Sequence, residues 1–214
     1  MAFRVAPFDN GMYLVVDGRK DAILIDPSMG EAEALRAVRE ERLRVLAILN
    51  THGHPDHAYA NAPMKRETGA RLAIHRLDEY RLDLITRAEG MRRPDGSQPF
   101  APASQAAADD RIEEGPITYL QDVRVEALHT PGHTEGSTCF YLPDDAILFS
   151  GDVLFPGTIG RVDQPGGDAR AMERSLERVA ALPPATQVYP GHLFAGTTTI
   201  GAELPWLRGF RFDG

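Results

Sequence analysis

The chain of 214 residues has little cysteine, little lysine and no long hydrophobic run. Its single cysteine, Cys139, excludes a disulfide framework and a cysteine-rich zinc module. No segment approaches the roughly 18 consecutive apolar residues of a membrane-spanning helix, so we expect no contact with a membrane. The first residues also lack the apolar stretch and cleavage site of a signal peptide. These absences together predict a cytoplasmic protein.

Positive charge is scarce as well. There are 23 basic and 31 acidic residues, which gives a net charge of −8. This balance argues against a nucleic-acid partner, because proteins bind that polyanion through basic side chains. The hydrophobic content of 43% is that of an ordinary globular protein, and we expect residues 1–214 to form one domain. What the chain does have is seven histidines against two lysines.

Two halves of the sequence show the same order of predicted elements. Each half has two strands joined by a turn, then a helix, then a strand that leads to a histidine. In the first half these elements lie at residues 12–16, 22–25, 31–42 and 45–49, before His52. In the second half, a hairpin within residues 136–152 precedes a helix at 169–182 and a strand at 187–189, before His192. The pattern predicts two similar ββ-α-β halves packed face to face, with their histidines at one rim.

The remaining segments connect these halves. We expect helices at residues 58–68, 77–87 and 200–207, and a strand at 72–74. Residues 88–110 are rich in glycine and proline and predict a long loop, either a surface excursion or a lid within the domain. Arg92 and Arg93 in this loop are candidates for contact with an anionic substrate.

The most informative segment is residues 51–57, with the sequence THGHPDH. Three histidines and an aspartate this close together can converge only on a tight loop, and Gly53 and Pro55 allow the necessary bends. Neutral imidazoles combined with a carboxylate suit zinc, iron or manganese, whereas calcium and magnesium prefer oxygen ligands. We therefore expect a transition-metal site directly after the strand at residues 45–49.

Three more segments end an apolar strand with a glycine and a potential metal ligand. These ligands are His133 in HTPGHTEGS, Asp152 in FSGD and His192 in YPGH. Any one of them alone is better explained as a turn, but together they complete a set of candidate metal ligands: His52, His54, Asp56, His57, His133, Asp152 and His192.

These motifs resemble those of the metallo-β-lactamase fold superfamily. The resemblance implies an α/β fold, a four-layer αββα sandwich with a metal site at one rim. It implies two divalent metal ions, with zinc as the default and iron or manganese as alternatives. The implied assignment to the first ion is His52, His54 and His133; to the second, Asp56, His57 and His192, with Asp152 bridging. Asp26 resembles the family's aspartate that orients the ligand loop without binding metal.

Within the superfamily, the sequence is most similar to the glyoxalase II-like group. The similar segments are GDVLF at residues 151–155, IGRVDQPGGD at 159–168 and YPGH at 189–192. The resemblance implies a hydrolase that cleaves a small-molecule thioester of the hydroxyacylglutathione type with a metal-bound hydroxide, which Asp56 helps to orient. A thiol leaving group has a pKa of about 8.5, so it departs as thiolate without a strong general acid.

Two positions bear on the substrate. Arg161 stands where this group carries a lysine or arginine near the substrate, although an ion pair with Asp163 or Asp168 would explain it equally well. Phe194 stands where the group has a glutathione-contacting tyrosine, so that hydroxyl is missing here.

Other readings of the same ligand set stay open. One is a persulfide dioxygenase of this fold with a single iron, which the chain resembles in its histidine motif and in Gly160, Arg161 and Asp163. Another is a lactone hydrolase, and a third is a metal-binding domain without activity.

The residual candidates have simpler interpretations. We expect His75 to be exposed or to cap a helix, and His129 to be structural. Cys139, Trp206 and Leu207 are expected in the core.

Overall fold

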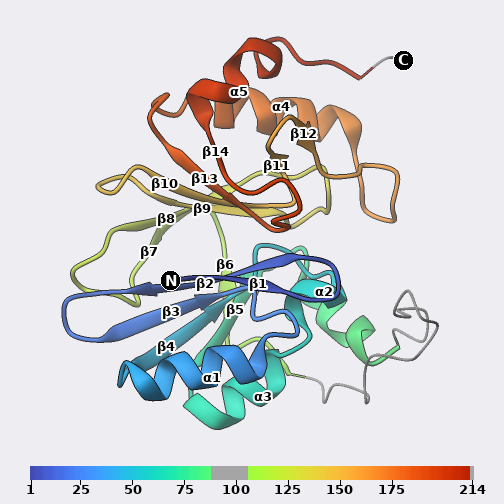
Figure 1. Cartoon of the computed structure of the whole chain (residues 1–214). Helices are drawn as coiled ribbons and strands as arrows, with labels where there is room; N and C mark the ends of the chain where they lie inside the picture. Colours follow the sequence, from blue (N-terminus) through green and yellow to red (C-terminus); the bar gives the residue numbers. More distant parts are fainter. Residues whose placement is uncertain (88–105, 213–214) are drawn as a thin grey trace.

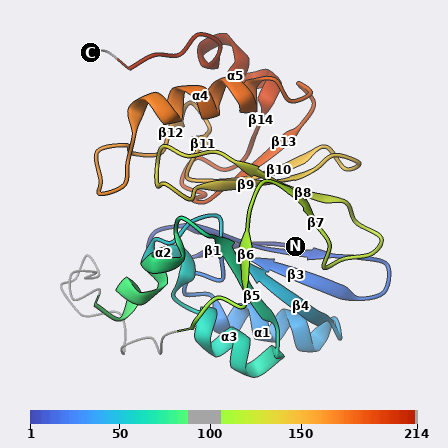
Figure 2. The same ribbon diagram turned by 180° about the vertical axis from the view of Figure 1, so that it is seen from behind.

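Two six-stranded sheets lie face to face, with helices on both outer surfaces (Figure 1). The structure is a computed structural model that describes residues 1–87 and 106–212. Helices α1 (Glu31–Glu40) and α3 (Asn61–Thr68) cover the first sheet, and α4 (Ala169–Ala180) and α5 (Ile200–Leu207) cover the second. The view from behind shows the same four layers (Figure 2). The expected αββα sandwich is confirmed.

The two sheets have corresponding strand orders. The first sheet contains, in spatial order, β1 (Ala2–Val5), β2 (Asn10–Val16), β3 (Asp21–Ile25), β4 (Arg44–Leu49), β5 (Arg71–His75) and β6 (Asp110–Ile112). The second contains β14 (Thr198–Thr199), β13 (Gln187–Pro190), β10 (Ile147–Gly151), β9 (Thr138–Leu142), β8 (Val125–His129) and β7 (Gly115–Ile117). A separate two-stranded ribbon pairs β11 (Leu154–Phe155) with β12 (Thr158–Ile159).

Each half contains a parallel strand pair that follows its hairpin and carries the chain to the same rim. In the first half, β3 runs parallel to β4 with Ile25 opposite Leu49. In the second half, β10 runs parallel to β13 with Gly151 opposite Pro190. In each half, the first strand of the parallel pair is also the second strand of an antiparallel hairpin, β2–β3 or β9–β10. The predicted ββ-α-β repeat is therefore present in both halves. Because parallel strands end at the same edge, the residues after all four strands meet there.

Strand alternation divides the apolar side chains among three layers. Leu14, Leu24 and Ile48 pack beneath α1 and α3. Their neighbours Tyr13, Ile25 and Leu49 point the other way and pack against the second sheet. A third cluster, including Cys139 and Leu207, lies between the second sheet and α4 and α5. Cys139 and Leu207 are therefore core residues as expected, and Trp206 packs partly buried at the edge of that cluster.

Two predicted helices differ from the observed ones. The helix expected at residues 58–68 is two helices, α2 (Pro55–Ala58) and α3. They separate because the Ala60 N–H donates to the Ser28 carbonyl at 2.7 Å instead of continuing the first helix. The helix expected at 77–87 is the 3-10 helix η1 (Glu79–Arg87), which opens with a hydrogen bond between residues three apart, from Arg81 N–H to Asp78 O.

The predicted loop at residues 88–110 lies mostly outside the described residues, as do Arg92 and Arg93. At its end, the loop gives way to strand β6, which begins at Asp110 and pairs with β5. Strand β6 has only three residues, too few to show the alternation of apolar and polar side chains by which a strand is predicted from sequence.

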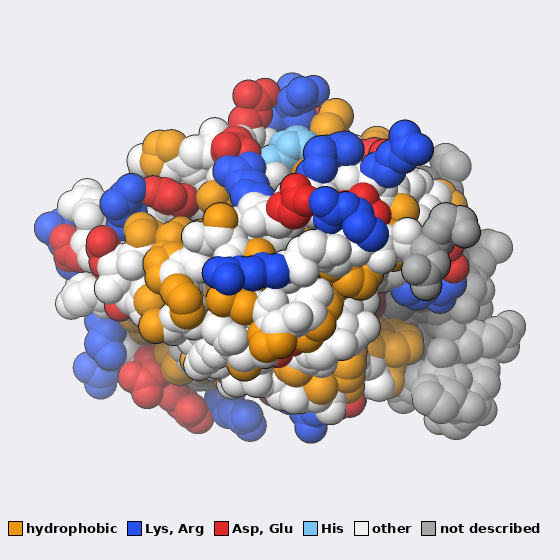
Figure 3. Space-filling model, turned by 90° about the horizontal axis from the view of Figure 1, so that it is seen from above, with side chains coloured by type: hydrophobic (Ala, Val, Ile, Leu, Met, Phe, Trp, Pro, Cys, Tyr) orange, Lys and Arg blue, Asp and Glu red, His pale blue; other side chains and the backbone are white. Residues whose placement is uncertain are grey.

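None of the helices in the described parts of the chain is long and apolar enough to cross a membrane. Seen from above, the face over α4 and α5 carries acidic and basic side chains close together (Figure 3). Arg211 and Glu177, paired at 2.6 Å, are one example on this face.

Candidate metal centre

The seven candidate ligands come together at the rim, on segments that follow strands; Asp56 and His57 lie in the one-turn helix α2, and the expected tight loop therefore covers only the residues before it. Residues 52–57 follow β4, residues 130–137 follow β8, Asp152 follows β10, and His192 follows β13. Hydrogen bonds join these loops across the two halves. The Thr138 N–H donates to the Thr51 carbonyl, and the Gly11 N–H donates to the Gly191 carbonyl, both at 2.8 Å.

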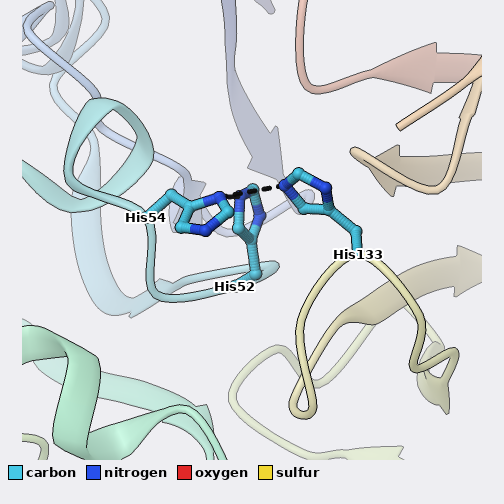
Figure 4. Close-up of side chains that lie close together, drawn as sticks. All are labelled: His52, His54 and His133. Atoms are coloured by element: carbon cyan, nitrogen blue, oxygen red, sulfur yellow. Dashed lines mark hydrogen bonds between the residues drawn. The ribbon is translucent and has the colours of Figure 1, made fainter. Parts of the chain in front are cut away.

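The first group of three ligands is His52, His54 and His133. Figure 4 shows the two first-half rings facing His133, which reaches them from the second half. His54 Nδ1 lies 3.1 Å from His52 Nε2 and 2.9 Å from His133 Nε2. Three imidazole nitrogens within 4.8 Å of one another match the donor set of a transition metal. We call this group the first set.

The second group is Asp56, His57 and His192, which we call the second set. Asp56 Oδ2 lies 3.4 Å from both His57 Nε2 and His192 Nε2, and the two imidazole nitrogens are also 3.4 Å apart. Two imidazoles and one carboxylate again form a donor set suited to zinc, iron or manganese.

Asp152 lies between the two sets. Its Oδ2 is 3.5 Å from His133 Nε2 of the first set and 3.4 Å from His192 Nε2 of the second. Its Oδ1 is 3.5 Å from His57 Nε2 but is buried without a hydrogen-bond partner. A buried carboxylate oxygen without a donor is costly, and a cation at this position would satisfy it. The residues present therefore fit a pair of metal ions.

The ring nitrogens that point away from the centre are held by fixed acceptors. His133 Nδ1 lies 2.8 Å from the Arg161 carbonyl, and His192 Nδ1 lies 2.9 Å from the Phe8 carbonyl. His57 Nδ1 lies 3.1 Å from Asp26 Oδ2. In the neutral ring, donation from Nδ1 to these oxygens would leave each Nε2 free and directed into the centre, as a metal ligand requires.

Asp26 supports the loop from behind. Besides His57, its two oxygens accept hydrogen bonds from the Thr51 N–H at 2.8 Å and the Thr51 hydroxyl at 2.6 Å. Although Asp26, His52 and His57 lie close enough to hold an ion by themselves, these bonds already engage both carboxylate oxygens. This arrangement fits the expected orienting role better than direct ligation.

The charges of the centre favour a cation. Burial lowers the pKa of His57, but Asp56, Asp152 and Asp26 outweigh burial and raise it to about 10. The pKa of His192 is raised against burial, chiefly by Asp152. In the first set, burial and the neighbouring His133 lower the pKa of His54 to about 4. The second set thus attracts positive charge, whereas burial also lowers the pKa of His52, so His52 and His54 of the first set are neutral imidazoles.

Close packing at the rim depends on one glycine in particular. A Cβ at Gly191 would lie 2.3 Å from Asp152 Oδ1 and 2.8 Å from His57 Cε1. Any side chain at this position would displace two candidate ligands, which explains the glycine directly before His192.

A cleft of about 710 Å³ opens onto the centre. Phe194 lines it with 54% of its surface exposed, and its ring lies 5.3 Å from that of Phe155. Arg161 also lines the cleft, but its guanidinium forms two 2.9 Å hydrogen bonds to the Asp163 carboxylate. Phe194 and Arg161, the two residues predicted to contact the substrate, therefore both lie at the cleft. Arg161 also forms the ion pair with Asp163 that the sequence suggested.

Sequence reasoning missed Asn10 and Asp78. Asn10 is buried and donates from Nδ2 to Asp56 Oδ2 at 3.1 Å. Asp78 is buried and accepts hydrogen bonds from two ligand loops. Neither residue belongs to a local motif, because Asn10 begins a strand and Asp78 lies in a turn far along the chain.

His75 is not exposed, contrary to one of the two expectations for it. It is buried and stacks on His129 with 4.1 Å between ring centroids, while its Nδ1 accepts the Leu77 N–H at 3.3 Å. The last contact lies in the turn before η1 and not at an N–H of that helix, which begins at Glu79, so the expected cap is not formed either. His129 Nε2 lies 2.9 Å from the Glu135 carbonyl and so braces the loop that carries His133.

Comparison with known proteins agrees with the fold. Residues 6–192 match the family described as the metallo-beta-lactamase superfamily. Hydroxyacylglutathione hydrolase GloC of Haemophilus influenzae is 34% identical over 205 residues, which are 93% of this chain and 92% of that protein.

Solved structures show the same architecture. The crystal structure of the B3 metallo-beta-lactamase BLEG-1 aligns with a TM-score of 0.84 and 30% identity, covering 96% of both chains. The protein TTHA1623 in a di-iron-bound form aligns with a TM-score of 0.77 and 37% identity, over 95% of this chain and 96% of that one. ETHE1 from Myxococcus xanthus gives 0.75 and 27%, covering 98% and 84%.

Proposed function

This chain belongs to the metallo-beta-lactamase superfamily, and from that premise we propose that it is a two-metal hydrolase of thioesters of the hydroxyacylglutathione type. The observation that carries the proposal is the position of the Asp152 carboxylate between two sets of three ligands. The similarity to the hydroxyacylglutathione hydrolase of Haemophilus influenzae over nearly the whole of both chains supports the choice of substrate.

In this proposal, His52, His54 and His133 hold one ion, Asp56, His57 and His192 hold the other, and Asp152 joins them. Zinc is the expected metal. Iron and manganese suit the same donors, and the di-iron form of TTHA1623 supports iron as the first alternative. When bound, the ions supply Lewis acidity that activates water and polarises the thioester carbonyl.

The side chains around the centre orient and position the reactants. Asn10 fixes Asp56 through the 3.1 Å hydrogen bond to Oδ2, which keeps that oxygen beside His57 and His192. The other carboxylate oxygen, Oδ1, is then the one proposed to align the attacking water. Asp56 is thereby the proposed catalytic carboxylate. A thiolate of pKa about 8.5 leaves without a protein acid, so the absence of a further general acid from the motifs is compatible with a thioester.

The cleft provides the proposed substrate contacts. Phe155 and Phe194 form an aromatic wall beside His192, which suits the apolar parts of a thioester. Arg161 lies beside the first set, because its carbonyl is 2.8 Å from Nδ1 of His133. Its guanidinium, which now pairs with Asp163, is the proposed contact for a carboxylate of the substrate.

The test is a parallel assay of the purified, metal-loaded protein. We expect hydrolysis of S-lactoylglutathione, and we expect Asp56→Asn to lower kcat by about 100-fold or more, because a positioned carboxylate contributes that much to proton-coupled steps. Asp122→Asn, which makes the same chemical change in an exposed ion pair with Arg19, is the matched control.

Three further measurements decide against the proposal if they are positive while hydrolysis is absent. Oxygen uptake with glutathione persulfide would assign the dioxygenase reaction, and ring opening of an acyl lactone would assign a lactonase. Hydrolysis of a β-lactam, the activity in the name of BLEG-1, would assign that reaction. Turnover of none of these substrates would favour the inactive metal-binding domain.

A further inference from the structure

Asp78 is a buried carboxylate outside the seven candidate ligands. It lies between β5 and η1 with none of its surface exposed. A buried carboxylate is retained only when hydrogen bonds and a counter-charge compensate for lost hydration. Arg81 supplies the counter-charge, with its Nε 3.3 Å from Asp78 Oδ1.

The hydrogen bonds of Asp78 reach two ligand loops from opposite halves of the molecule. Oδ2 accepts from the Gly53 N–H at 2.8 Å, between His52 and His54. The same oxygen accepts from the Thr134 hydroxyl at 2.7 Å, next to His133, and Oδ1 accepts from the Gly136 N–H at 2.8 Å. One carboxylate therefore joins the loops that carry all three histidines of the first set.

Close packing makes this junction tight. A Cβ at Gly53 would lie 2.5 Å from Arg81 Cβ, and a Cβ at Gly136 would lie 2.7 Å from Asp78 Cβ and Cγ. Glycine at both positions allows the two loops to rest directly on the turn of residues 78–81. Arg81 extends the contact by binding Glu135 at 2.6 Å and the Pro165 carbonyl at 2.9 Å.

The second set is supported differently. His57 is held by Asp26, and His192 by the Phe8 carbonyl. The three hydrogen bonds of Asp78 described above all go to the loops of the first set. Asp78 thus bonds the backbone or a side chain beside all three histidines of the first set, whereas Asp26, which also holds Thr51, bonds the ring of His57 in the second set.

We propose that Asp78 is a positioning residue that sets the distance between His133 and the His52–His54 pair, and so determines metal affinity at the first set alone. This inference rests on the proposed two-metal centre but not on the choice of thioester. Residues that hold metal ligands in place typically contribute about 10–100-fold in metal affinity. The Asp78→Asn variant retains the size of the side chain but replaces one carboxylate oxygen with an NH2 group. This group would face the N–H of Gly53 or Gly136, and that hydrogen bond would be lost.

The experiment is a stepwise zinc titration of the metal-free protein against a chromophoric chelator. In Asp78→Asn we expect one of two binding constants to fall by about 10–100-fold and the other to stay within about twofold of the unmodified protein. Glu79→Gln is the matched control, because it changes the adjacent carboxylate, which pairs with the exposed Arg111. It should leave both constants unchanged.

Three outcomes would overturn the inference. Two unchanged constants in a destabilised Asp78→Asn protein would assign a merely structural role, and an equal fall in both constants would contradict the selectivity. If Asp78→Asn does not fold, Thr134→Val removes one of the three bonds and must still weaken only one constant; unchanged constants there would also overturn it. If the unmodified protein binds no zinc, iron or manganese, the proposed function itself fails instead.

Discussion

Asp26 and Asp78 show how single side chains outside the ligand set shape the centre. Asp26 engages Thr51 and His57, whereas Asp78 engages Gly53 and the loop of His133. The loop of residues 51–57 is therefore fixed on both sides by buried carboxylates, and its histidines are directed before any ion binds. Such preorganisation lowers the entropic cost of metal binding.

Phe194 lacks the hydroxyl of the glutathione-contacting tyrosine that the glyoxalase II-like group has at this position. A substitution here therefore tests which thiol the substrate carries. If this position contacts glutathione, Phe194→Tyr should lower KM for S-lactoylglutathione by about 2–10-fold and leave kcat unchanged, because one added hydrogen bond contributes about 0.5–1.5 kcal/mol. Steady-state kinetics with lactoyl thioesters of glutathione and of N-acetylcysteamine measures this change. An equal gain for the truncated thiol, or no gain for either, would contradict a glutathione contact.

At the residue scale, the sequence predicted the convergence of the candidate ligands but not their supports. His52, Asp152 and His192 could be found because each follows an apolar strand with a glycine nearby. Asn10 and Asp78 could not be found, because their roles arise from contacts with residues tens of positions away. His75 was misjudged for the same reason: its burial comes from His129, which belongs to the other sheet.

At the scale of elements, the stacked pair of His75 and His129 joins the ends of β5 and β8. Burial lowers the pKa of His75 to about 4, and His129 and Arg76 add to the lowering, while Asp78 and Glu113 oppose it. The folded protein therefore binds this proton less tightly than the unfolded chain, whose histidine pKa is about 6.5. The stability that neutral His75 provides is complete above pH 6.5 and is lost as the pH falls through 4.

A substitution at this junction tests that dependence. The free energy of unfolding of metal-free His75→Phe should fall less between pH 7 and pH 4.5 than that of the unmodified protein, because the titrating ring is gone. At pH 7 the variant should be about 1 kcal/mol less stable, since the Leu77 N–H loses its acceptor. Urea unfolding at several pH values measures both effects. Parallel pH curves for the two proteins would contradict the assigned pKa shift.

Long apolar elements were predictable and short edge elements were not. The strands β2, β3, β4 and β10 and the helices α1, α4 and α5 follow clear hydrophobic patterns, and their positions agree with expectation. The edge strands β6, β7 and β14 have two or three residues each and are defined by pairing with a neighbour. The break between α2 and α3 likewise depends on a distant partner, the Ser28 carbonyl.

At the scale of the whole molecule, the two similar halves place the centre at the junction between them. Each set of ligands draws on both halves, so metal binding should stabilise their association as well as supply chemistry. The net charge of −8 describes the protein without metal. Two divalent ions would change it to −4, and the added positive charge would lie at the cleft, where it would attract an anionic thioester.

The central claim, a two-metal centre, is tested most directly by the number of metal ions per chain. Elemental analysis should find about two equivalents of zinc, iron or manganese in the purified protein. His192→Ala should retain about one, because it removes a ligand of the second set while leaving His52, His54 and His133 in place. One equivalent in both proteins, with oxygen uptake on a persulfide and no thioester hydrolysis, would contradict the account.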